Sequence, residues 1–389
     1  MKQATRNKSR LVKISKILLV IFVTIFIGLA VAEAYFVFFN PQGATDFFKT
    51  DEYVGMIHKP NMEGIYSTRE YSTPIKINSA GFRDNERTLN KDPNVTRIAV
   101  LGDSFVEAFQ VTLDKSFPHI LEEELNNNSE GKKYEVLNFG VSSFGTAQEY
   151  LMLKHYAMNY HPDIVILAFL TANDVSDNGY KLQKNHNNNV PYFILDSSNK
   201  LVQISSENRN ISNSSANLAA FLRVFKSALG SIFPNTANFL VNFYNRKYVF
   251  TYKDALNVYS DNYSEEDWQD AWNVTKALIL ETKNFSEVNG ARFVLVSLAN
   301  NIQVNPGWWN ETVKKYPEMA DWNPEKPDKI LEDFSSKNNI SYIRLLPYFK
   351  DYYNRTGRNL YFYSDGHWNE EGQRLAAEAI YENLKYKLQ

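Results

Sequence analysis

The chain has 389 residues, 44% hydrophobic and 22% charged, so it is long and apolar enough to bury a sizeable core. Its formal net charge of −2 gives no electrostatic reason to expect a nucleic-acid partner, and basic residues cluster only within the first sixteen positions. Cysteine is absent, which excludes disulfides, cysteine metal ligands and a thiol nucleophile.

The N-terminus predicts a single membrane-spanning helix. A basic tail over residues 1–16 precedes an apolar run over residues 17–39, in which the only charge is Glu33. This run is long enough to cross a bilayer, and its basic flank should stay in the cytoplasm, which places the rest of the chain outside. A cleaved secretory signal is the open alternative, because Ala30-Val31-Ala32 is a small-x-small cleavage pattern. Both interpretations export the domain that follows.

Residues 40–95 are polar, rich in Tyr, Asn and Thr, and lack helical periodicity. We interpret them as a linker followed by a small β-rich lead-in that ends near residues 75–77. The turn-forming sequence Asn78-Ser79-Ala80-Gly81 follows.

From Arg97 onward, apolar strand-like runs alternate with helical patterns. Strands are predicted over residues 98–101, 134–138, 164–170, 292–298 and 340–346. Helices are predicted to begin at Ser116-Phe117-Pro118, at a capping box over residues 146–149, and near residue 370. Such alternation predicts an α/β domain over residues 96–389, with a mostly parallel sheet covered by helices on both faces.

The alternation is lost between about residues 180 and 290. Asn- and Ser-rich stretches there are loop-like, whereas residues 218–229 and 266–285 have helical patterns. We interpret this region as an insertion into the sheet domain.

Gly102-Asp103-Ser104 directly follows the first predicted strand. In an open parallel sheet, ligands bind beyond the carboxyl ends of the strands, so a functional loop is expected here. A serine at a strand-to-helix turn can present its hydroxyl as a nucleophile. The alternative is that Asp103 or Ser104 is only a helix cap.

Asp365-Gly366-His367 precedes the last predicted helix. In a loop, the aspartate can accept the imidazole Nδ1–H and leave Nε2 free to take a serine proton. Taken alone, the pair also fits a solvated loop.

Two further segments end at the same predicted edge of the sheet. Gly140 follows the second strand and Asn173 follows the third. The Gly140 N–H, the Asn173 amide and the Ser104 N–H together would make an oxyanion hole. A tight turn at Gly140 and a cap or Asx turn at Asn173 are the alternatives.

These four segments resemble, in order and spacing, the four blocks of the SGNH (GDSL) hydrolase superfamily, in particular its secreted or membrane-anchored prokaryotic members. The resemblance covers residues 97–389 without the insertion. It implies a three-layer α/β/α flavodoxin-like domain, with Ser104 as nucleophile, His367 as base, Asp365 orienting it, and Ser104, Gly140 and Asn173 stabilising the oxyanion. Thr171 departs from the family pattern, which has glycine at this position.

The expected function is extracytoplasmic ester hydrolysis, with O-acetyl groups on surface glycans as one substrate class. An O-acyltransferase that uses the same residues, and a non-catalytic glycan-binding module, are the alternatives. Neither a cofactor nor a metal is expected, because the sequence contains no Walker motif, dinucleotide fingerprint or zinc signature.

Overall fold

The computed structural model describes residues 2–39, 47–129, 131–183, 190–204, 232–233, 236, 252–260 and 266–388. The chain forms two compact units. One comprises Met1–Ala44, Ser67–Arg69 and Ile211–Tyr248, and the other comprises Thr45–Tyr66, Glu70–Asn210 and Val249–Gln389.

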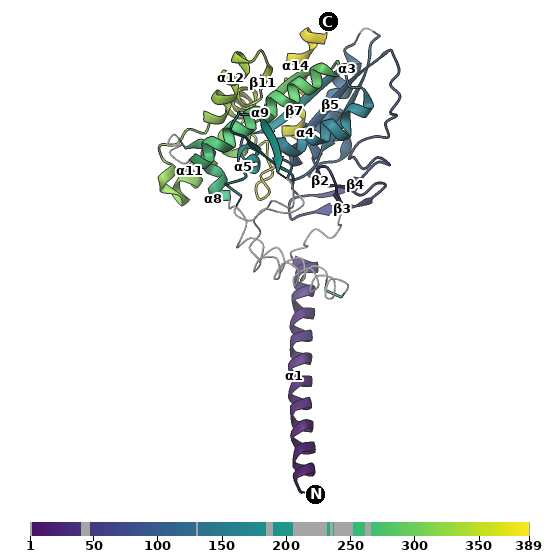
Figure 1. Cartoon of the computed structure of the whole chain (residues 1–389), viewed down its shortest axis with the longest axis vertical. Helices are drawn as coiled ribbons and strands as arrows, with labels where there is room; N and C mark the ends of the chain where they lie inside the picture. The colour runs from purple at the N-terminus through teal and green to yellow at the C-terminus, as the bar shows by residue number, and fades with distance from the viewer. Residues whose placement is uncertain are drawn as a thin grey trace. The chain divides into compact units, whose positions relative to one another are not determined.

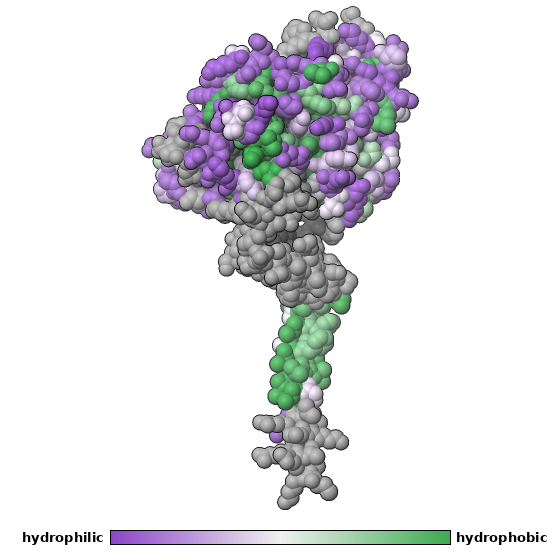
Figure 2. All heavy atoms as spheres, viewed as in Figure 1, coloured by the Kyte–Doolittle hydropathy of each residue, from purple (hydrophilic) through white to green (hydrophobic). Residues whose placement is uncertain are grey.

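The first unit is built on one long helix, α1 (Lys2–Phe39). Its segment Lys13–Tyr35 is long and apolar enough to cross a membrane, and none of its most apolar window is buried inside the protein. Figure 2 shows this segment as an apolar surface along the helix. The predicted apolar helix is therefore present.

Two contacts join α1 to the later part of its unit. The ring of Phe26 packs edge-on against Phe233, with 5.4 Å between the centroids. The Glu33 carboxylate accepts hydrogen bonds from the backbone N–H and the hydroxyl of Thr236, both at 2.8 Å.

The second unit is organised around a five-stranded parallel sheet (Figure 1). In chain order the strands are β5 (Val95–Gly102), β6 (Lys133–Gly140), β7 (Ile164–Leu170), β10 (Arg292–Leu298) and β11 (Ser341–Arg344). Their spatial order is β6-β5-β7-β10-β11, which is the flavodoxin-like order 2-1-3-4-5. The α/β fold with a parallel sheet is thus confirmed.

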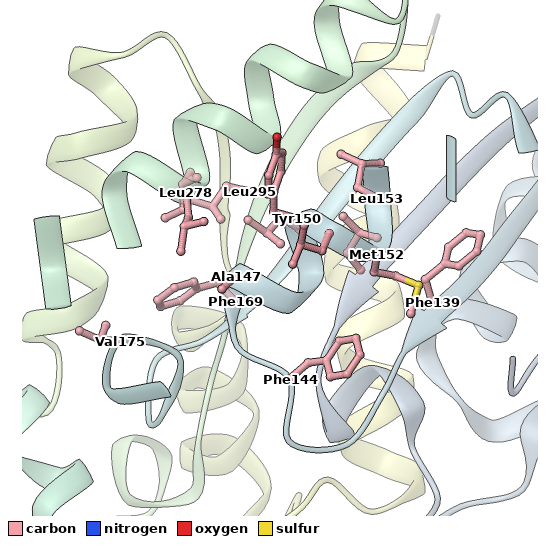
Figure 3. Packing of buried hydrophobic residues seen from close by; sticks show 14 of the residues in the cluster. Phe139, Phe144, Ala147, Tyr150, Met152, Leu153, Phe169, Val175, Leu278 and Leu295 are labelled. Atoms are coloured by element: carbon pink, nitrogen blue, oxygen red, sulfur yellow. The ribbon is translucent and has the colours of Figure 1, made fainter. Parts of the chain in front are cut away.

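Helices cover both faces of this sheet, which makes three layers. The helices on one face are α3 (Phe117–Asn127), α13 (Leu346–Thr356) and α14 (Glu370–Leu388). Those on the other face are α4 (Thr146–His155), α9 (Glu266–Val288) and α12 (Lys326–Lys337). Strand residues alternate between the two cores because successive side chains point to opposite faces. Figure 3 shows Phe139, Phe169 and Leu295 among the side chains of the core on the face that α4, α9 and α12 cover.

The fifth predicted strand is shorter than expected. The apolar run over residues 340–346 predicts strand throughout, but β11 ends at Arg344 and α13 begins at Leu346. Pro347 lies in the first turn of α13, where a missing N–H costs nothing and the fixed φ favours a helix start. The apolar run therefore supplies both the end of a strand and the start of a helix.

The lead-in consists of two antiparallel hairpins. They are made of β1 (Phe48–Asp51) with β2 (Gly55–His58), and β3 (Glu63–Ser67) with β4 (Ser72–Lys76). A small core of Phe47, Ile75 and Ile77 packs around Phe109, which lies just after the Ser104 turn. The lead-in therefore packs against the segment that carries the predicted nucleophile.

The region predicted as an insertion contains a hairpin and two helices among its described residues. The hairpin is β8 (Tyr192–Leu195) with β9 (Leu201–Ile204), and α8 (Tyr252–Ala255) precedes α9. The predicted helix over 266–285 is α9, which packs against α4 and thus belongs to a layer of the sheet domain. The predicted helix over 218–229 lies outside the described residues.

Three further helices follow strands of the sheet: α5 (Asp174–Asn178) after β7, then α10 (Asn301–Val304) and α11 (Pro306–Lys315) after β10.

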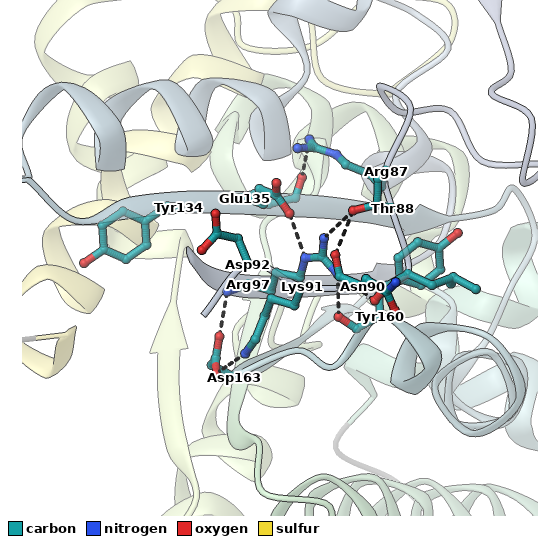
Figure 4. A network of polar contacts seen from close by, with 12 residues as sticks. Arg87, Thr88, Asn90, Lys91, Asp92, Arg97, Tyr134, Glu135, Tyr160 and Asp163 are labelled. Atoms are coloured by element: carbon teal, nitrogen blue, oxygen red, sulfur yellow. Dashed lines mark hydrogen bonds and ion pairs between the residues drawn. The ribbon is translucent and has the colours of Figure 1, made fainter. Parts of the chain in front are cut away.

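A buried polar network ties together the starts of the strands (Figure 4). Arg97, 1% exposed, bonds the Glu135 carboxylate at 2.7 Å and the Tyr160 carbonyl at 2.9 Å. Asp163 accepts from the Arg97 N–H at 2.7 Å and pairs with Lys91 at 2.6 Å. This network lies at the opposite end of β5 from Ser104, so we assign it to stability.

Candidate active site

Ser104 is the first residue of α2 (Ser104–Glu107), two residues after β5 ends. The turn is tight: a Cβ at Gly102 would lie 2.2 Å from a methyl group of Val106, so this position needs glycine. Asp103 caps α2 by accepting the Phe105 N–H at 2.9 Å. The cap alternative therefore applies to Asp103, whereas the Ser104 hydroxyl is directed elsewhere.

The Ser104 Oγ lies 2.7 Å from Nε2 of His367, although 263 residues separate them. Nδ1 of His367 lies 3.0 Å from Oδ2 of Asp365. The aspartate and histidine lie in a loop, where Gly366 adopts the left-handed φ of 81°. The structure thus brings the three predicted catalytic residues together in the order hydroxyl, imidazole, carboxylate.

The pKa values of His367 and Asp365 are shifted in the directions that a serine nucleophile with an imidazole base requires. Burial alone would lower the pKa of His367, but the hydrogen bond and charge of Asp365 outweigh it and raise the pKa above its ordinary 6.5. Burial would raise the pKa of Asp365, but its bond to His367 holds the pKa below 3.8. Asp365 is therefore charged at neutral pH, and His367 is a stronger base than a free imidazole.

Two residues that the sequence did not point to hold this loop. Glu70, between β3 and β4, accepts the backbone N–H groups of Tyr363 and Ser364 at 2.7 Å and of Asp365 at 3.2 Å. Trp368 is fully buried, and its indole N–H donates to the Ala299 carbonyl at 3.0 Å. The lead-in and the end of β10 thus both fix the loop that carries the imidazole.

Asn173 lies immediately before α5, at the same edge of the sheet. Its Nδ2 donates to Asp177 Oδ2 at 2.9 Å, which uses one of its two amide hydrogens. The second hydrogen has no acceptor among the described residues.

Thr171 also has a structural explanation. It is fully buried, and its hydroxyl lies 3.0 Å from Gln303 Oε1 and 3.3 Å from the Leu298 carbonyl. The hydroxyl joins the end of β7 to the end of β10, a contact that glycine cannot make.

Gly140 ends β6 and lies against the Ser104 turn: a Cβ here would lie 2.4 Å from the Glu107 nitrogen. Its N–H, the predicted donor, is engaged by Asn138 Oδ1 at 2.9 Å. In the same loop, Ser143 has a left-handed φ of 66°. Its N–H has no acceptor among the described residues, which makes it the loop's available donor.

Three buried acids, Asp103, Glu149 and Asp174, and the partly buried Asp177 lie close enough to influence one another's charge. Burial raises the pKa of Asp103 to about 6 and that of Asp177 to about 7. Burial and mutual repulsion raise the pKa values of Glu149 and Asp174 as well. In the part of the chain that the structure describes, no three His, Asp or Glu side chains are arranged to hold a metal ion.

No protein-family model matches this sequence, and no curated protein matches it. The chain is structurally similar to solved GDSL-type lipases and esterases. A GDSL-like lipase from Bacteroides thetaiotaomicron is 10% identical, with a TM-score of 0.36 over 77% of this chain and 93% of that one. The esterase EstA from Pseudoalteromonas sp. is 12% identical, with a TM-score of 0.38 over 75% and 98%. An acetyl xylan esterase, AlAXEase, is 10% identical, with a TM-score of 0.37 over 74% and 98%. At these values the likeness assigns no chemistry to this chain.

Proposed function

We propose that this protein is a membrane-anchored serine esterase of the SGNH type, which hydrolyses an ester through an acyl-serine intermediate. The observation that carries the proposal is the chain of contacts from Ser104 Oγ to His367 Nε2 and from His367 Nδ1 to Asp365 Oδ2. A nucleophile, a base and a group that orients the base are the three parts that this chemistry needs.

In the first step, Ser104 Oγ attacks the ester carbonyl carbon while His367 Nε2 takes the hydroxyl proton. The tetrahedral intermediate collapses, His367 returns that proton to the departing alcohol, and an acyl-serine remains. Water, deprotonated by His367, then attacks the acyl-serine; the bond between the acyl carbon and Ser104 Oγ breaks, His367 returns the proton to Oγ, and the carboxylic acid leaves. Asp365 stabilises the imidazolium that forms in each step.

The oxyanion of each intermediate needs donors near Ser104. We assign this role to the Ser104 N–H, the Asn173 amide and one amide of the loop after β6. Gly140 is the donor that the sequence predicts, and Ser143 is the one whose N–H has no acceptor among the described residues. Such donors supply a large part of the rate in acyl transfer.

For the substrate, we propose an acetyl ester on a surface carbohydrate. Tyr363, two residues before Asp365, is 67% exposed, and its ring lies 5.8 Å from that of Trp308. An exposed aromatic ring in the loop that carries Asp365 and His367 provides a flat, partly apolar face of the kind that suits a sugar ring.

We further propose that α1 is retained as an anchor, with its basic end in the cytoplasm. The apolar run does not stop at the small-x-small pattern but continues to Phe39, the last residue of α1. This length favours the anchor over a cleaved signal.

Hydrolysis of p-nitrophenyl acetate by the full chain in detergent tests the esterase proposal. Wild type would be compared with Ser104→Ala and with Ser129→Ala, a control in a surface loop before β6. We expect turnover in wild type and in the control, and a loss of several orders of magnitude in Ser104→Ala. Equal rates in wild type and Ser104→Ala, with both folded by circular dichroism, would contradict simple esterase activity.

A further inference from the structure

Glu107, the last residue of α2, is a charged residue buried beside the nucleophile, with 1% of its surface exposed. Its Oε1 accepts the Ser142 N–H at 3.0 Å, and its Oε2 accepts the Ser142 hydroxyl. Both carboxylate oxygens thus hold one residue of the loop after β6. Since α2 begins at Ser104, this single side chain joins the nucleophile turn to that loop.

His58, at the end of β2 in the lead-in, contacts the Glu107 carboxylate from the other side. It is fully buried, and its Nε2 lies 2.6 Å from Glu107 Oε1. Its Nδ1 faces the Gly81 carbonyl at 3.3 Å. The buried ring thus lies between the Gly81 carbonyl and the Glu107 carboxylate. With His58 on one side and Ser142 on the other, the carboxylate of Glu107 has little freedom to move.

Arg83 fixes the backbone of the same turn. Its guanidinium, 1% exposed, donates to the Glu107 carbonyl at 2.6 Å and also to the carbonyls of Ala108 and Val111. Ala108 has a left-handed φ of 58°, which an L-residue adopts only when its surroundings require it. The lead-in thus holds both the side chain and the backbone of Glu107.

The consequence lies in the loop of residues 140–144. Four of its five backbone N–H groups donate to acceptors. The N–H of Gly140 donates to Asn138 Oδ1 and that of Val141 to the Gly102 carbonyl. The N–H of Ser142 donates to Glu107 and that of Phe144 to the Val141 carbonyl. The fifth belongs to Ser143, whose left-handed φ is also unfavourable for an L-residue. Because Ser143 directly follows Ser142, the carboxylate that holds the Ser142 N–H and hydroxyl restricts the backbone from which the Ser143 N–H projects.

We infer that Glu107, locked by His58, is a positioning residue that holds the Ser143 N–H in place as an oxyanion donor beside Ser104. This inference rests on the proposed esterase function. It assigns to the lead-in, through His58, a part in setting the reaction rate and not only in packing.

Steady-state hydrolysis of p-nitrophenyl acetate by the full chain tests the inference with Glu107→Gln, Ser142→Ala and the double variant. Glutamine keeps the shape of Glu107 but loses the charge and one acceptor. We expect kcat to fall about 10- to 100-fold in Glu107→Gln while KM changes less than about twofold, since the donor acts on the transition state. Because Glu107 acts through Ser142, the double variant should lose no more than Glu107→Gln alone.

Glu135→Gln is the matched control. It removes the charge of a partly buried glutamate, the partner of Arg97, at the far end of the sheet. We expect it to lower thermal stability and leave kcat within about twofold of wild type. A second readout is the rate at which a fluorophosphonate probe labels Ser104, which should fall with kcat in Glu107→Gln because the adduct needs the same donors.

The outcomes separate the two proposals. If Ser104→Ala is inactive but Glu107→Gln keeps the wild-type kcat and labelling rate, the positioning role is wrong and the esterase stands. The positioning role would also be wrong if the fold-loss of kcat in the double variant equalled the product of the losses in the two single variants. If wild type and Ser104→Ala react equally slowly, both proposals fall. If Glu107→Gln does not fold, Ser142→Ala tests the inference, because it removes the hydrogen bond from the Ser142 hydroxyl to Glu107. A kcat equal to that of wild type in Ser142→Ala would contradict a positioning role for this hydrogen bond.

Discussion

His367 sets the pH dependence expected of the reaction. The imidazole must be neutral to take the Ser104 proton, so activity should rise with pH through the pKa of His367, which lies above 6.5. In Asp365→Asn the charge and the carboxylate acceptor are lost, so this pKa should fall and the midpoint of kcat/KM against pH should move to lower pH. The rate on the plateau should fall by about 10⁴-fold, because the tautomer is no longer fixed.

The pH profile distinguishes this role from a structural one. If Asp365 only supported the fold, its variant would lose melting temperature while the midpoint stayed where it is in wild type. The measurement is kcat/KM for p-nitrophenyl acetate between pH 5 and 9, with stability recorded at each pH.

Asn173 should act on the transition state alone. Its second amide hydrogen is the available one, since Asp177 accepts the first. Asn173→Ala should therefore lower kcat by about 10²- to 10³-fold with little change in KM. Asn128→Ala, at the end of α3, is the control that should leave the rate unchanged. A fall confined to KM would assign Asn173 to substrate binding instead.

The sequence predicts Ser104, Asp365, His367 and Asn173 because each directly follows or borders a recognisable element. It gives no sign of His58 or Glu70, whose partners lie 49 and 293 or more residues away. A buried histidine and a glutamate in a hairpin are unremarkable until the fold shows what they touch. The sequence does not indicate Ser143 for another reason. Glycine at position 140 suggests an unusual backbone conformation, whereas the left-handed φ of Ser143 is visible only in the structure.

Among the elements, the β3–β4 hairpin has a predicted part in catalysis. Glu70 accepts three successive amides of the loop that carries Asp365 and His367. In Glu70→Ala these amides lose their acceptor, and the imidazole should lose its alignment with Ser104. We expect kcat to fall roughly 10- to 100-fold, with a smaller fall in Glu70→Gln, which keeps one acceptor oxygen. Equal rates in all three proteins would show that the loop holds its geometry without the hairpin.

The contact between α4 and α5 should make stability depend on pH. Glu149, fully buried, has a pKa well above its ordinary 4.5, because of burial and the charges of Asp103 and Asp177 around it. Asp174 faces it and is shifted upward as well. A raised folded-state pKa means that the folded protein binds more protons, so the contribution to stability is full at low pH and is lost as pH rises above about 4.5.

Glu149→Gln removes one of these acids and weakens the repulsion on Asp174. Between pH 5 and 8, wild type should lose unfolding free energy as pH rises, and the variant should lose less of it. The difference in slope should approach about 1.4 kcal/mol per pH unit for each proton involved. Urea unfolding at four pH values measures it, with Glu287→Gln, an exposed glutamate on α9, as the control. Equal slopes in wild type and Glu149→Gln would show that Glu149 is charged in the fold.

For the whole molecule, the order of the strands is what makes the site. The sequence predicts strands and their parallel alternation from apolar runs, and β7 and β10 have the predicted bounds. The order in space is not visible in those runs. Placing β5 between β6 and β7 puts Ser104 between the loop of Ser143 and the loop of Asn173. A sheet in simple chain order would put β5 at the edge, with only one of these loops beside it.

The anchor is the last prediction, and it concerns α1 alone. Because the chain has no cysteine, an introduced thiol is the only one that can react. In Leu19→Cys, a retained α1 carries this thiol into the mature membrane protein, so we expect a maleimide to label the denatured protein and its intact mass to include residues 1–32. Ser129→Cys is the control, because its thiol stays in the chain whether or not α1 is removed. A mature chain that begins at Glu33 would be labelled in the control but not in Leu19→Cys. That result would show that α1 is a signal removed on export.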